Sequence, residues 1–155
     1  MQRQAVHLVA EVRGGAKFEQ ALAEITAKLN KYGTLKVGFL SGAKYSNGTP
    51  VALIAAIQNY GAPRAGIPPR PFFSNMVKDK QKEWPGALKL ALKASNYDVA
   101  AALNVVGEGI KGQLQQSIKD TNSPPLKPAT IRRKGFAKPL ISTGLLINSA
   151  TYKVE

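Results

Sequence analysis

The stretch DVAAALNVVGEGIKGQLQQSIK, residues 98–119, decides the fold. Its large apolar side chains recur every three or four residues, which predicts a long amphipathic helix buried along one face: Val99, Leu103, Val106, Ile110, Leu114 and Ile118. Three glycines, Gly107, Gly109 and Gly112, lie inside this pattern. Each costs up to ~1 kcal/mol relative to alanine in a helix. A helix that keeps them is expected to pass very close to another backbone, or to bend there.

Shorter patterns on both sides of this helix predict the other elements. Alternating apolar residues predict an N-terminal strand over residues 4–12, a second strand over 34–40 and a C-terminal strand within SATYKVE, 149–155. Helices are predicted over residues 17–32, where one apolar stripe should be buried, and over 50–60, 71–82 and 87–94, with a helical turn at 128–135 and a helix break at Pro85. The sequence therefore predicts one α+β domain, residues 1–155, with a small antiparallel or mixed sheet covered by helices.

The charge of the chain points to an anionic neighbour. Twenty-two lysines and arginines against nine acidic residues give a formal net charge of +13. Such an excess suits nucleic acid or an acidic protein, and it also favours solubility. No apolar run reaches the ~20 residues of a membrane span, and the N-terminus has no apolar signal-peptide core. The chain is expected to be a soluble protein made in the cytoplasm, with no membrane partner.

Motifs of enzymes are weak in this sequence. The G-x-G-x-x-G match at residues 107–112 lies inside the long helical pattern, whereas a dinucleotide site needs a strand before it and a helix beginning at it. There is no cysteine, and the lone histidine, His7, cannot supply a usual zinc site or a catalytic triad. We therefore expect no enzyme, and no catalytic, cofactor-binding or metal-binding residue.

The stretch APRAGIPPRPFFSN, residues 62–75, predicts a stiff loop that protrudes from the domain over about 62–73. Its prolines fix several φ angles and remove backbone donors. In one interpretation they set a corner and the phenylalanines seal the core. In the other, the loop is a preorganised docking element that presents Arg70 and Phe73 to a partner. Both hold together if Phe72 points inward and the loop faces outward.

The densest basic cluster is Arg132-Arg133-Lys134. Such a cluster can contact phosphate without reading sequence, or face an acidic partner, or form a solvated helix end.

Two segments carry a resemblance to a known family. GAPRAGIPPRPFF, residues 61–73, resembles a loop of the tail-completion and head–tail joining proteins of tailed bacteriophages, also described as virion morphogenesis or neck proteins. LKPATIRRKGFAKPLISTGLLINSATYKV, residues 126–154, resembles the closing pattern of that family. The resemblance covers about residues 36–154. It departs from the family at Ser142, where an acidic residue is expected, and at Ala150, where a larger aliphatic residue is common.

The resemblance implies a structural role in the virion, at the neck or the head-proximal end of the tail. Copies would form a homo-oligomeric ring around the DNA passage, beside other neck, connector or tail proteins, with sequence-independent contact to packaged DNA. The residues implied at protein interfaces lie in two groups: Ile67, Pro68, Pro69, Arg70, Pro71, Phe72 and Phe73, then Thr143, Gly144 and Leu145. The Thr143 hydroxyl is expected to cap a short helix and so set the angle of the last strand. A different interpretation of the charge is a non-specific nucleic-acid-binding protein that acts outside the virion.

Overall fold

The computed structural model describes residues 15–29, 33–40 and 42–155, and it confirms the predicted α+β fold. Within these ranges the chain forms seven α-helices and one two-stranded antiparallel sheet. The elements are α1 (Gly15–Leu29), β1 (Leu35–Gly38), α2 (Val51–Tyr60), the short 3-10 helix η1 (Pro63–Ala65), α3 (Phe72–Lys80), α4 (Trp84–Ala94), α5 (Val99–Asp120), α6 (Pro128–Lys134), α7 (Leu145–Asn148) and β2 (Thr151–Val154). None of the described helices is long and apolar enough to cross a bilayer.

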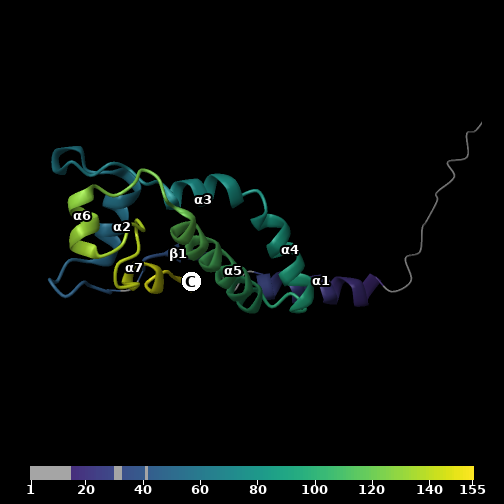
Figure 1. Ribbon diagram of the computed structural model, residues 1–155. Coiled ribbons are helices and arrows are strands. Elements are labelled where there is room, and N and C mark those ends of the chain that lie inside the picture. Colours follow the sequence, from purple (N-terminus) through teal and green to yellow (C-terminus); the bar gives the residue numbers. More distant parts are fainter. Residues whose placement is uncertain (1–14, 30–32, 41) are drawn as a thin grey trace, which may run out of the picture.

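Helix α5 runs through the middle of the molecule (Figure 1). Asp98 caps its first turn, because the carboxylate Oδ1 accepts a hydrogen bond from the Ala101 N–H at 3.0 Å. Helices α3 and α4 pack along α5, and so do both strands. The predicted apolar face is buried, and the Leu114 and Ile118 side chains are fully enclosed. The long helix is therefore the support on which the other elements are placed.

A close approach of α5 to a neighbour occurs at one of its three glycines. A Cβ added to Gly107 would lie 2.5 Å from Tyr152 Cδ2 and 2.9 Å from Leu35 Cδ1, so α5 does approach a neighbour very closely there. The neighbour is the side-chain layer of the sheet and not a backbone. Gly109 and Gly112 face open space, with no atom within 4 Å of an added Cβ, so no close approach explains them.

The sheet joins residues distant in sequence. Strands β1 and β2 are antiparallel, with Leu35 opposite Val154 and Gly38 opposite Thr151, so the predicted C-terminal strand is confirmed. At the end of this strand pair, the Glu155 carboxylate forms salt bridges with Lys36 Nζ at 2.6 Å and with Lys153 Nζ at 2.9 Å. The predicted N-terminal strand over residues 4–12 lies outside the described residues.

Two expectations about helices are wrong. The apolar stripe of α1 is not buried in the single chain, since Phe18 is 66% exposed and Leu22 is 46% exposed. Helix α1 projects from one end of the molecule (Figure 1), and Ile25 of the stripe is half-buried. The break between α3 and α4 falls on the turn at residues 81–83, whereas Pro85 lies in the first turn of α4, where its missing N–H is harmless.

Candidate basic interface at the α2 and α6 end

The proline-rich segment has two parts: a small protruding tip at residues 62–67, and a base at residues 68–72 that packs against the rest of the molecule. Gly61, at φ +79°, ends α2 and donates its N–H to the Ile57 carbonyl. Ala62 and Ile67 then pair across a tight turn that contains η1 and Gly66, at φ +63°. This tip extends from the upper left of the molecule in Figure 1. The predicted protruding loop is thus limited to the first part of its range.

Arg70 forms the base of the segment, and the prediction that it is presented to a partner is wrong. Its side chain is only 4% exposed. Nε donates to the Pro124 carbonyl at 2.9 Å, and the two terminal nitrogens donate to the Pro125 carbonyl and to Gln58 Oε1 at 3.2 and 3.1 Å. A guanidinium carries several N–H donors in fixed directions, so it can donate to the carbonyls of two adjacent prolines. The prolines themselves have no backbone N–H to donate.

The two phenylalanines differ in burial. Phe72 is 1% exposed and contacts Phe39 edge-to-face, with ring centroids 6.3 Å apart, so the inward orientation predicted for it is confirmed. Phe73 is half-buried at the edge of the core. Of the four residues around Arg70, Pro69 is exposed, while Ile67, Pro68 and Pro71 are half-buried. The corner interpretation therefore describes residues 68–72, and the surface available for docking is the tip, Pro69 and part of Phe73.

Asn59 was missed by sequence reasoning, although it holds this corner together. It is 4% exposed, and its Oδ1 accepts hydrogen bonds from the N–H groups of Phe73 and Ser74 at 3.0 and 3.1 Å. Helix α3 begins after Pro71, which cannot cap it, so the cap comes from α2. The only sequence signal was the lack of a capping residue before Phe72.

The proline-rich segment and the C-terminal region line one pocket of about 630 Å³. We call it the α6 pocket. Its apolar walls come from α2, the tip and residues 126–146: Ile54, Ile67, Leu126, Leu140, Ile141 and Leu146. Its charged groups are all cationic: Arg70, Lys127, Arg133 and Lys134. The two segments that carry the family resemblance therefore meet at this pocket.

The α6 pocket lies in a part of the chain without carboxylates. No aspartate or glutamate occurs between Glu24 and Asp79, or between Asp120 and Glu155. Burial lowers the pKa of Lys134, and the charge of Arg70 lowers it further. Burial also lowers the pKa of Arg70. Positive charge in the pocket is thus not balanced by a carboxylate of the same pocket, and an anion placed there would relieve the repulsion.

The three residues of the predicted basic cluster differ in exposure. Arg132 and Arg133 are exposed, whereas Lys134 is half-buried and donates to the Lys138 carbonyl, with its Nζ 4.6 Å from the centre of the Phe136 ring. The two arginines are therefore the exposed members of the cluster, and Arg133 also lines the α6 pocket.

The second group of predicted interface residues forms the start of α7. Thr143 Oγ1 accepts a hydrogen bond from the Leu145 N–H at 3.3 Å, within a local turn. The N-cap position of α7 is occupied by Gly144 and has no side-chain cap, so the prediction that the Thr143 hydroxyl caps this helix is wrong. Gly144, at φ +78°, lets the chain turn into the helix. Thr143 is exposed, and Gly144 and Leu145 are half-buried. The buried Leu146 fixes α7 immediately before β2.

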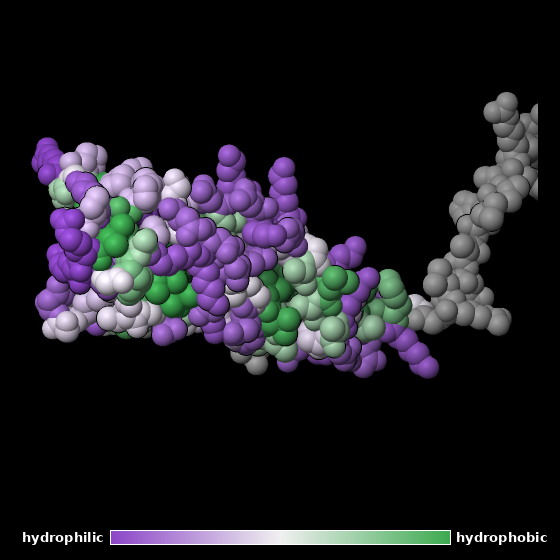
Figure 2. Space-filling view, viewed as in Figure 1, coloured by the Kyte–Doolittle hydropathy of each residue, from purple (hydrophilic) through white to green (hydrophobic). Residues whose placement is uncertain are grey.

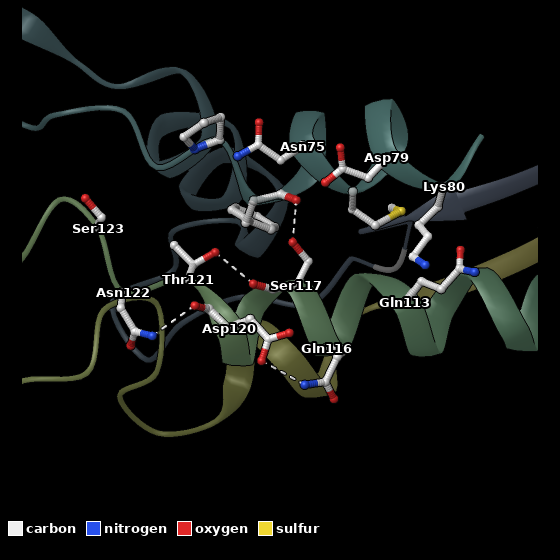
Figure 3. Close-up of a pocket in the computed structure, with 13 residues that line it drawn as sticks. Asn75, Asp79, Lys80, Gln113, Gln116, Ser117, Asp120, Thr121, Asn122 and Ser123 are labelled. Atoms are coloured by element: carbon white, nitrogen blue, oxygen red, sulfur yellow. Dashed lines mark hydrogen bonds between the residues drawn. The ribbon is translucent and has the colours of Figure 1, made fainter. Parts of the chain in front are cut away.

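A polar hollow of about 470 Å³ lies between α3 and the end of α5 (Figure 3). Its side chains are largely engaged with one another and with helix ends: Ser117 Oγ donates to the Phe72 carbonyl, Thr121 Oγ1 to the Ser117 carbonyl, and Gln116 Nε2 to Asp120 Oδ1 (Figure 3). These bonds tie α3 to α5 and close the end of α5. Across the described ranges, no three histidine, cysteine or acidic side chains are grouped to hold a metal ion.

Comparison with known proteins adds no relative. No protein-family model, no curated protein and no solved structure matches the chain.

Proposed function

We propose that the protein is a structural component of a tailed phage or prophage, placed at the neck or the head-proximal end of the tail. It would join or complete the tail by oligomeric assembly around the DNA passage. The observation that carries the proposal is that the two segments resembling the family, separated in sequence, form one structural unit. Arg70 binds the carbonyls that immediately precede the second segment, and both segments line the α6 pocket.

The geometry suits interlocking between subunits. The tip at residues 62–67 projects from the molecule, and its base is fixed by Arg70 and by Asn59. A projection that is already rigid loses little conformational entropy when a neighbour contacts it. The exposed Arg132 and Arg133, in a region free of carboxylates, would face packaged DNA or an acidic neck, connector or tail protein. No chemical step is required of the protein.

Electron microscopy of lysates from the parent phage, with this gene deleted, tests the role. We expect full heads beside unattached tails, or tails with abnormal head-proximal ends. Supplying the gene in trans should restore joined particles. Intact, infectious particles from the deletion would overturn the proposal.

A second candidate is a non-specific nucleic-acid-binding protein that acts outside the virion. The carboxylate-free stretches around the α6 pocket favour it, because contact with phosphate is sequence-independent and electrostatic. Gene context separates the two candidates: neighbouring capsid, connector and tail genes favour the virion role.

A further inference from the structure

An apolar groove lies over α5, away from the α6 pocket. It has a volume of about 610 Å³. Its floor is Leu103, Val106 and Ile110 of α5, and its walls come from β1 on one side and from α3 and α4 on the other. Every lining residue except Gln81 is apolar, and Phe73, Val77 and Trp84 are among them. We call it the α5 groove.

The α5 groove is the incompletely covered part of the core. Its floor residues are 8–9% exposed, whereas Leu114 and Ile118 further along α5 are fully buried. A groove with apolar floor and walls and almost no polar lining is suited to another apolar side-chain row and not to a charged ligand.

The same chain carries an apolar row that is only partly covered. Phe18, Leu22 and Ile25 stand at positions i, i+4 and i+7 of α1, and the first two are largely exposed. This is the anchor spacing by which an amphipathic helix binds a groove. Figure 2 shows hydrophobic surface over the end of the molecule that carries α1 and α4.

The row and the groove match in length. The α1 row extends over seven residue steps, from Phe18 to Ile25, and the floor of the groove extends over seven residue steps of α5, from Leu103 to Ile110. Each span is therefore about 10 Å at the helical rise of 1.5 Å per residue.

Charges of both signs lie beside the two surfaces, since Lys17 adjoins Phe18 of the α1 row and Glu83 adjoins Trp84 of the groove lining. Glu19 and Glu24 adjoin members of the α1 row in sequence. On the receiving side, three exposed lysines each follow a residue that lines the groove: Lys78, Lys82 and Lys89. None of these three forms an ion pair within residues 15–29, 33–40 and 42–155.

We propose that α1 of one copy docks in the α5 groove of a second copy. Lys28 Nζ of α1 lies 3.4 Å from the Asn96 carbonyl, in the turn between α4 and α5. Helix α1 extends from there beyond the other helices (Figure 1). Phe18 and Leu22 are exposed, and no described residue of α1 lines the groove of its own chain. A contact between two different surfaces is heterologous, and it closes into a ring when the rotation between copies permits. The inference rests on the proposed function for its setting, a ring in the virion, and on the residues above for its contact.

Self-association of the purified full chain is the first test, measured by sedimentation velocity over a range of concentrations. Wild type should form dimers or larger species as concentration rises. Phe18→Ser with Leu22→Ser should weaken this association by roughly tenfold or more, as expected for loss of two central anchors. The matched control is Ala23→Ser with Ala27→Ser on the opposite face of α1, which should associate as wild type does. Monomers at all concentrations, or equal weakening by both pairs, would overturn the proposal.

Disulfide trapping identifies the occupant, and the absence of native cysteine makes the result simple to read. A chain with Leu22→Cys, mixed with a differently sized tagged chain with Val77→Cys, should give a cross-linked product containing both. Ala27→Cys in place of Leu22→Cys should give little of it. A chain carrying both Leu22→Cys and Val77→Cys should cross-link between copies. If it instead closes on itself as a monomer, the occupant is its own α1 and the proposal is wrong.

The contact and the proposed function can fail separately. If the serine variants associate normally while the gene deletion leaves heads and tails unjoined, the α1 contact is wrong and the neck role stands. If the deletion gives normal particles, the neck role is wrong, and the sedimentation and trapping results still decide the contact.

Discussion

Gly107 stands where α5 crosses the sheet, and alanine there would place a methyl group 2.5 Å from Tyr152 Cδ2. Because the contact is near the stem of a ring and not at the end of a flexible chain, the sheet must shift. We expect Gly107→Ala to lower the free energy of unfolding by about 1–3 kcal/mol, as overpacking does in other cores. Chemical denaturation measures the change.

Gly109 is the matched control, since it lies in the same helix with open space around it. Gly109→Ala should raise the free energy of unfolding by about 0.5–1 kcal/mol through its helix propensity. Equal effects of the two substitutions would contradict the close approach at Gly107.

Arg70 stabilises the fold through its side-chain hydrogen bonds. Its removal leaves the Pro124 and Pro125 carbonyls without their partner. We expect Arg70→Ala to destabilise the fold by about 1–3 kcal/mol, because three hydrogen bonds from a buried guanidinium would be lost. Arg64→Ala in the exposed tip should change stability by no more than about 0.5 kcal/mol. A fully stable Arg70→Ala protein would show that the arginine serves the surface and not the fold.

At the scale of elements, the β1–β2 pair depends on pH through Glu155. Hydrogen bonds from Lys36 and Lys153 lower the pKa of this carboxyl from 4.5 to about 2. A lowered folded-state pKa gives stability that is complete above pH 4.5 and is lost as pH falls toward 2. Glu155→Gln should therefore reduce the loss of thermal stability between pH 5 and pH 2. The effect should shrink at high salt, because the group is exposed. Identical pH profiles for the two proteins would exclude Glu155 as a contributor.

The elements that the sequence predicts well are those with a strong local period. Helix α5 and the two described strands lie where the apolar patterns put them. The packing predicted for α1 is wrong. A periodic apolar stripe indicates that one face of a helix is suited to burial, but it does not indicate which molecule covers that face. The partners of Arg70 and Asn59 could not be predicted, since each is set by residues far away in sequence. For the candidate site, local sequence could identify the stiffness of the loop, but not which of its side chains turn inward.

At the scale of the whole molecule, charge is segregated. Carboxylates occur on α1, on α3 to α5 and at Glu155, and the residues around α2, the tip and α6 have none. A duplex that meets this molecule should therefore be bound in one orientation, with the exposed arginines of α6 toward the phosphates. The orientation should be fixed because hydrogen bonds of Arg70 and Asn59 hold the tip and the segment before α6 rigidly together.

The orientation can be measured through the salt dependence of duplex binding. Each phosphate contact contributes a slope of about −0.9 to log K against log salt concentration. We expect Arg132→Ala with Arg133→Ala to make the slope shallower by up to about 1.8, one contact's worth for each arginine. The matched pair Lys80→Ala with Lys93→Ala, on α3 and α4, removes the same charge from the elements next to Asp79 and Glu83. That pair should leave the slope nearly unchanged. Equal losses from both pairs would mean that binding senses only the total charge, and the oriented contact would be wrong.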